Sequence, residues 1–210
     1  MFSAKEWVCI RGNRKLFSPV SFSLMAGEIL LIQGANGSGK TTLLRSLAGI
    51  FSNHSGSLFW QNVKINPEHE DHAERALLIG HKEPMKPHLS VEENLAFWAD
   101  IFGSGNAGVK EALQSFALEH LKSIRIGNLS AGQKHRATLA LLRICKRSLW
   151  LLDEPTANLD QTATEILATQ IIHHREEGGI AIIATHDSLT IPDTKLLVLA
   201  DPHPHLNGRG

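Results

Sequence analysis

The segment from Gly34 to Thr41, GANGSGKT, constrains the fold more than any other part of the sequence. It matches the pattern G-x-x-x-x-G-K-[ST] and stands between an apolar run at 29–33, which is typical of a strand, and the helix-forming sequence TLLRSLAG. Glycines in this pattern let successive backbone N–H groups point at a polyphosphate, and the following helix adds the positive end of its dipole. We therefore predict a phosphate-binding loop in an α/β fold.

Side-chain chemistry assigns roles within this loop. Lys40 is expected to reach the β- and γ-phosphates and to act in catalysis, and the hydroxyl of Thr41 is expected to complete a magnesium shell. Thr42 is expected near the phosphates at the start of the helix. The other residues expected to cradle the nucleotide are Gly34, Ala35, Asn36, Gly37, Ser38 and Gly39. A glycine-rich turn with an accidental lysine is the alternative, which the flanking strand and helix patterns disfavour.

Three residues suited to hydrolysis follow apolar runs. Asp153 and Glu154 come after the run at 148–152, and His186 comes after the run at 180–185. In open α/β sheets, ligands bind at the carboxyl ends of the strands. We expect Asp153 to orient Mg²⁺ through water, Glu154 to align the attacking water or accept its proton, and His186 to contact the γ-phosphate. A structural or surface role is the alternative for His186.

The remaining apolar runs complete the expected strands, and the later ones are continuous enough to be covered on both faces of a parallel sheet. These runs are 7–10, 20–24, 29–33, 58–61, 76–80, 148–152, 180–185 and 196–200. Residues from about 90 to 122 carry apolar side chains at helix spacing, with GSGNAG at 103–108 as a break.

We therefore predict one α/β domain over residues 1–210, with a mixed or parallel core sheet and a small N-terminal antiparallel β-subdomain. The core is assigned to about 1–89 and 145–200, an inserted helical subdomain to about 90–144, and a tail to 201–210.

Composition excludes several classes of protein. The chain has 210 residues, of which 42% are apolar, so a disordered or fibrous protein is excluded. Lys and Arg together number 21, as do Asp and Glu, so there is no basic field for nucleic acid. No run of about 18 apolar residues occurs, so we expect no spanning segment. Cys9 and Cys145 lack the CxxC spacing of a zinc site, and a reducing compartment fits.

The segment Leu129 to Gln133, LSAGQ, precedes the helix-forming sequence KHRATLALLRICKR. Ser130 followed by Gln133 three residues later is a capping box, which predicts a helix N-terminus. A capped helix start with a serine hydroxyl and glycine N–H groups is also an anion site, so both interpretations can hold.

The ordered set of motifs resembles the ATP-binding-cassette (ABC) ATPases. GANGSGKT, LSAGQ, LWLLDEP, the segment 157–160 in the place of the D-loop, and Thr185-His186 occur in the order of that family over roughly residues 4 to 200. The resemblance implies the P-loop ABC ATPase fold and ATP with Mg²⁺ as cofactors.

The resemblance also implies a head-to-tail dimer of two copies of the chain. In such a dimer, Ser130, Gly132 and Gln133 of one protomer face the nucleotide held by Lys40 of the other. Asp160 would lie at the interface between the two sites; a turn carboxylate that caps the next helix is the alternative.

Two positions depart from the family pattern. The aromatic residue that stacks on adenine is absent, and its position falls near Arg11, which would either stack its guanidinium on the base or remain solvated. The glutamine that senses magnesium is replaced by His81 or Lys82, and His81 is the candidate metal ligand, with an ordinary loop histidine as the alternative.

Within the family, the compact length, LLIGHK, and LSAGQ followed by a basic residue resemble the ATPase subunits of cytochrome c maturation systems. This resemblance implies an ATP hydrolase that energises haem handling through integral membrane subunits, at the cytoplasmic face of the inner membrane. The loop 81–89, with Lys86, and a helix bearing Phe97 and Trp98 are the expected docking surface; a core role for Phe97, Trp98, Met85 and Leu89 is the alternative.

Other functions remain open at this point. They are another small-molecule ABC exporter, a soluble regulatory or DNA-repair ATPase, and a nucleotide-binding module without catalysis. Zero net charge and the lack of a long coiled-coil insertion between residues 42 and 128 disfavour the DNA-repair class. The joint presence of Glu154 and His186 disfavours the non-catalytic module.

Overall fold

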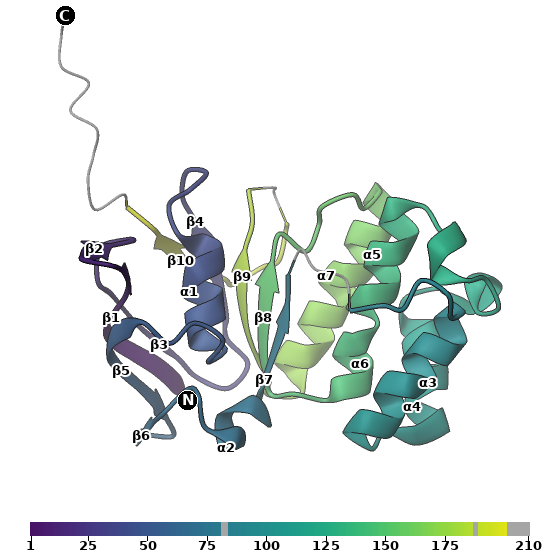
Figure 1. Ribbon diagram of the computed structural model, residues 1–210, viewed down its shortest axis with the longest axis horizontal. Coiled ribbons are helices and arrows are strands. Elements are labelled where there is room, and N and C mark those ends of the chain that lie inside the picture. Colours follow the sequence, from purple (N-terminus) through teal and green to yellow (C-terminus); the bar gives the residue numbers. More distant parts are fainter. Residues whose placement is uncertain (81–83, 187–188, 201–210) are drawn as a thin grey trace, which may run out of the picture.

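The computed structural model describes residues 1–80, 84–186 and 189–200, and within them the central feature is a five-stranded parallel sheet (Figure 1). Its spatial order is β10-β4-β9-β8-β7. The strands are β4 (Ile29–Gln33), β7 (Ala76–Ile79), β8 (Leu149–Asp153), β9 (Ile180–Ala184) and β10 (Lys195–Val198). β8 and β9 are buried along their whole length, which explains their unbroken apolar sequences. The predicted parallel core sheet is confirmed.

A second sheet, formed near the N-terminus, is antiparallel, as predicted. Its strands are β1 (Phe2–Arg11), β2 (Arg14–Lys15), β3 (Val20–Leu24), β5 (His54–Trp60) and β6 (Val63–Ile65). β1 and β5 shift register between Lys5 and Val8, where Glu6 has a φ of 50°. A Cβ on Gly56 would lie 2.4 Å from the carbonyl oxygen of Glu6, so this bulge requires glycine.

Helix α1 (Lys40–Leu47) joins the two sheets (Figure 1). Leu43, Leu44 and Leu47 are fully buried in a core shared by β1 and β8, and full burial of each leucine stabilises the fold by about 1.5–3 kcal/mol. The indole of Trp7 in β1 donates a 2.9 Å hydrogen bond to the Ser46 hydroxyl. These contacts fix the helix whose N-terminus follows the phosphate-binding loop.

The helical part of the chain, residues 91–145 and 161–176, lies on the face of the parallel sheet opposite to α1 (Figure 1). The α-helices are α2 (Glu70–Ala73), α3 (Val91–Phe102), α4 (Gly105–Ser115), α5 (Ala131–Leu139), α6 (Leu141–Cys145) and α7 (Gln161–Glu176), with 3-10 turns η1 (Glu119–Leu121) and η2 (Ile126–Asn128). α3 to α6 fall between β7 and β8 in the chain, and the subdomain boundaries at about 90 and 144 stay a prediction. None of the helices in the described ranges is long and apolar enough to cross a bilayer.

The helical prediction for 90–122 is correct for α3 and α4 but wrong at its end. The break is shorter than 103–108, because Gly103 ends α3 with a left-handed φ of 70° and α4 already begins at Gly105. α4 ends at Ser115, and Ala117 has a φ of 50°, which an α-helix cannot include.

A buried histidine on α7 couples the stability of the fold to pH. The ring of His174 stacks on Trp150 of β8 with 3.8 Å between ring centroids and 5° between planes. Burial lowers the pKa of His174 from 6.5 to about 4, although its hydrogen bond to the Ile180 carbonyl opposes the shift. The unfolded chain therefore takes up a proton at a higher pH than the folded chain does. The stability is complete above pH 6.5 and decreases as the pH falls toward 4.

We predict that this histidine makes the free energy of unfolding fall by about 3 kcal/mol between pH 6.5 and 4. Denaturant titrations across this pH range measure the effect. His174→Gln, which cannot titrate, should show a shallower pH dependence, whereas His120→Gln, at an exposed position, should retain the wild-type slope. Parallel curves for the wild type and His174→Gln would show that the assignment is wrong.

Candidate functional site

The loop between β4 and α1 has the conformation that the glycine pattern predicts. Gly39 immediately precedes α1 with a φ of 98°, and a Cβ there would lie 2.7 Å from the Phe17 ring, so only glycine fits without displacement. No side chain caps the N-terminus of α1. The first N–H groups of this helix, together with its dipole, therefore suit an anionic ligand.

Lys40, at the start of α1, is buried, with an exposed fraction of 7%. Its ammonium group makes three close contacts. Its Nζ donates to the carbonyl oxygens of Gly34 at 2.9 Å and Ala35 at 3.3 Å. It also lies 2.8 Å from Nε2 of His186. Because an ammonium group only donates, Nε2 accepts this hydrogen bond and the imidazole hydrogen is on Nδ1.

Glu154 meets the same histidine from the end of β8. Its Oε1 is 3.5 Å from His186 Nε2, and its Oε2 accepts a 3.1 Å hydrogen bond from the His186 backbone N–H. Its side chain is 18% exposed, whereas that of His186 is 44% exposed. Lys40, Glu154 and His186 thus converge from three segments that are far apart in the sequence.

These three residues share one cavity with most of the phosphate-binding loop. The cavity has a volume of about 360 Å³ and is lined by Asn36, Gly37, Gly39, Lys40, Thr41, Thr42, Glu154 and His186. Each of these residues is among those that the sequence predicts for the nucleotide site. Asp153, the last residue of β8 and the one before Glu154, is buried, with an exposed fraction of 4%.

The serine motif begins a helix, as predicted, but does not meet the cavity. The Ser130 hydroxyl accepts from the Gln133 N–H at 3.2 Å, and Gln133 Oε1 accepts from the Ser130 N–H at 3.0 Å, which forms the predicted capping box at the start of α5. Figure 1 shows α5 and α1 on opposite sides of β8 and β9. Ser130, Gly132 and Gln133 are absent from the cavity lining.

Three other candidates lie apart from the cavity or outside the described residues. Asp160 caps α7 by accepting a 2.7 Å hydrogen bond from the Ala163 N–H. This is the helix-capping role that the sequence offers as the alternative to an interface role. Arg11 is exposed at the end of β1, where it pairs with Arg14 in a hairpin, and it does not line the cavity. His81 and Lys82 lie outside the described residues.

Two contacts near the site could not be predicted from the sequence. His135 of α5 lies 2.9 Å from the carbonyl oxygen of Pro155, and a Cβ on Gly132 would lie 2.5 Å from the carbonyl oxygen of Asn158. Both partners are backbone oxygens, which every residue carries, so no residue type in the sequence signals either contact.

The parallel sheet, the glycine loop and the converging Lys40, Glu154 and His186 define a phosphate-loop nucleotide-binding protein. A sequence model of the ABC transporter family matches residues 17–157. The chain belongs to this family.

Curated relatives align over almost the whole chain. A Rhodospirillum rubrum protein named cytochrome c biogenesis ATP-binding export protein CcmA is 42% identical over 199 residues, covering 95% of this chain and 85% of that protein. The Escherichia coli K12 protein of the same name is 38% identical over 196 residues, covering 93% and 94% of the two chains.

Solved structures share the fold at lower identity. The ATP-binding subunit of an ABC transporter superimposes with a TM-score of 0.82 at 21% identity, covering 95% of this chain and 85% of that chain. A dimeric ATP-binding cassette in a post-hydrolysis state, bound to ADP and Pi, superimposes with a TM-score of 0.80 at 21% identity, covering 95% and 94%. These likenesses establish the ABC ATPase fold.

Proposed function

We propose that this chain is the ATP-hydrolysing subunit of a membrane export system that serves cytochrome c biogenesis. The observation that carries the proposal is the convergence of Lys40, Glu154 and His186 on one cavity at the uncapped N-terminus of α1. The names of the 42% and 38% identical relatives supply the biological setting.

The geometry supports in-line attack of water on the γ-phosphate of ATP. The ammonium group of Lys40 now contacts two loop carbonyls and His186, and phosphate oxygens would replace these neutral acceptors with charged ones. That exchange frees Nε2 of His186, which donates to a γ-phosphate oxygen once the imidazole hydrogen is on Nε2 instead of Nδ1. The Glu154 carboxylate beside it aligns the water. Positioning and charge stabilisation account for most of the catalysis in phosphoryl transfer.

The residues also fit Mg²⁺ that enters with the nucleotide. No group of three His, Cys, Asp or Glu in the described ranges could hold a metal ion by itself. The hydroxyl of Thr41 and the carboxylate of Asp153 are oxygen donors, which Mg²⁺ prefers, and phosphate oxygens and waters would complete its shell. When bound, the ion neutralises charge on the β- and γ-phosphate oxygens.

A complete site is proposed to need two copies of the chain. Ser130 is exposed at the N-terminus of α5, on the other side of the parallel sheet from α1 (Figure 1). It can therefore meet a nucleotide held by Lys40 only if that lysine belongs to a second copy. Asp160 is exposed as well, so its capping role leaves it accessible to a partner copy.

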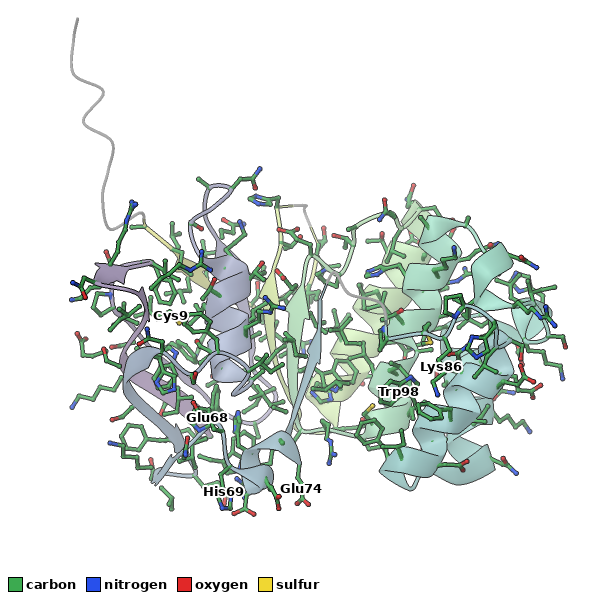
Figure 2. The ribbon with its side chains drawn as sticks, viewed as in Figure 1. Cys9, Glu68, His69, Glu74, Lys86 and Trp98 are labelled. Atoms are coloured by element: carbon green, nitrogen blue, oxygen red, sulfur yellow. The ribbon has the colours of Figure 1, made fainter. Side chains whose placement is uncertain are left out.

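The proposed membrane contact involves the segment before α3 and the first turns of that helix. Lys86 Nζ lies 3.4 Å from the ring centre of Phe97, and Figure 2 shows Lys86 and Trp98 on this part of the molecule. Phe97 and Trp98 are half-buried, and Trp98 packs against the core that contains Met85, which is 7% exposed. We propose that this surface docks integral membrane subunits at the cytoplasmic face of the inner membrane.

We predict that Lys40→Ala lowers the rate of ATP hydrolysis by about 100-fold or more, because it removes a positive charge that stabilises the transition state. Phosphate release by the full chain with Mg-ATP measures this rate. Lys5→Ala, at an exposed position in β1, serves as the control and should retain wild-type turnover. Near-normal turnover in Lys40→Ala would contradict the assignment of the loop.

We predict that Glu154→Gln binds ATP but hydrolyses it slowly, because the amide retains the shape of the side chain and cannot accept a proton. Trapped ATP should then hold two copies together, so light scattering should report a dimer with saturating Mg-ATP and a monomer without nucleotide. Normal hydrolysis would exclude Glu154 as the base. A chain that remains monomeric with bound ATP would argue against the two-copy site.

We predict that Lys86→Glu reduces the function of the assembled membrane complex without changing the affinity of the chain for ATP. The charge reversal removes the cation above Phe97 and alters the proposed contact surface. Lys110→Glu, on α4, changes the same charge elsewhere in the helical part and should have no such effect. If Lys86→Glu supports wild-type function and copurifies with the membrane subunits, docking occurs elsewhere.

A further inference from the structure

The turn that begins at Glu154 is fixed by backbone hydrogen bonds to the sheet and within the turn itself. On the sheet side, the Glu154 N–H donates a 2.8 Å hydrogen bond to the Ala184 carbonyl of β9. Within the turn, the Ala157 N–H donates to the Glu154 carbonyl and the Leu159 N–H donates to the Thr156 carbonyl, each at 3.1 Å. The turn is therefore compact, and a displacement of one residue moves its neighbours.

Glu154 itself has a left-handed backbone conformation, with a φ of 50°. A residue with a side chain pays a conformational cost there and keeps the conformation only when its surroundings enforce it. Asn158, at the other end of the turn, has a φ of 62°. The position of the Glu154 carboxylate thus depends on external contacts with residues 154–158.

Two of these contacts come from α5, the helix that begins at the serine motif. His135 is 8% exposed, and its Nε2 lies 2.9 Å from the Pro155 carbonyl oxygen. Because a carbonyl oxygen only accepts, Nε2 carries the hydrogen and donates it. Gly132 packs so closely on Asn158 that a Cβ would lie 2.5 Å from the Asn158 carbonyl oxygen. The start of α5 and the turn after Glu154 are therefore in direct contact at two points.

We propose that His135 is a positioning residue, which transmits the position of the serine motif to the catalytic carboxylate through the Pro155 carbonyl. This inference rests on the proposed two-copy site. There, Ser130 and Gly132 meet the nucleotide of the second copy, while Glu154 acts on the nucleotide of its own copy. His135 joins the two through one hydrogen bond, so engagement of one site by the second copy sets the geometry of the other.

The decisive experiment compares three variants of the full chain. His135→Phe keeps a ring in the buried position and removes the donor, whereas His135→Gln restores an N–H donor on a side chain of similar reach. Thr138→Val is the matched control, because Thr138 is 1% exposed one turn further along α5 and its hydroxyl donates within the helix, to the Lys134 carbonyl at 3.1 Å. Steady-state phosphate release with Mg-ATP gives kcat and KM, and thermal melts show how much of each variant is folded.

We expect His135→Phe to lower kcat at least 10-fold with KM within twofold of the wild-type value. His135→Gln should recover most of kcat, and Thr138→Val should match the wild type in both constants. A role in folding alone would instead lower the melting temperature and the active fraction, without this split between kcat and KM and without rescue by glutamine.

Three outcomes would overturn the inference. They are a kcat of folded His135→Phe within twofold of the wild type, equal losses in His135→Phe and Thr138→Val, or no recovery in a folded His135→Gln. Failure of the proposed function would give a different result: Lys40→Ala would release phosphate at the same rate as the wild-type chain.

Discussion

The parallel pairing of β4, β9 and β8 is the constraint on which the site depends. In its register, Ala184 of β9 pairs with Ile32 of β4 on one side and with Asp153 of β8 on the other. The three strands therefore end at the same edge of the sheet, and the chain leaves each of them toward the same volume. This pairing brings the ammonium group of Lys40 to 2.8 Å from His186, although 146 positions separate the two residues in the sequence.

The same arrangement keeps the serine motif away from the cavity. α1 packs on one face of the parallel sheet, while α5 belongs to the helical part beyond the other side of β8 and β9 (Figure 1). Gly132 and His135 hold α5 against the turn after Glu154, so this helix supports the proposed catalytic base of its own chain. Its capped N-terminus remains exposed and is suited to an anion that a second copy presents.

Much of this site could be predicted because its residues are specified by local patterns. The glycine loop, the acidic pair after an apolar run and the histidine after another each combine a residue type with a strand end, and parallel topology brings strand ends together. The capping box at Ser130 is likewise a local pattern, and the structure contains it. Arg11 is a candidate only through its position in a family pattern, which no local feature of the sequence supports, and it is not among the residues that line the cavity.

Other features depend on tertiary packing, which local patterns do not contain. β2 and β6 are two and three residues long and are paired by neighbouring strands rather than signalled by apolar runs. α4 ends at Ser115 although the apolar spacing continues, because Ala117 adopts a left-handed conformation and the chain turns back toward η1. The contacts of His135 and Gly132 involve carbonyl oxygens of a turn whose shape emerges only in the folded chain.

The central claim, that one ATP site is completed by two copies of this chain, is tested most directly by the dependence of turnover on protein concentration. The rate of phosphate release per chain should be measured over a range in which light scattering shows the nucleotide-free chain to be monomeric. The two-copy site predicts a rate per chain that rises with concentration and then reaches a plateau. A rate per chain that stays constant over that range would contradict it, because each chain would then hydrolyse ATP alone.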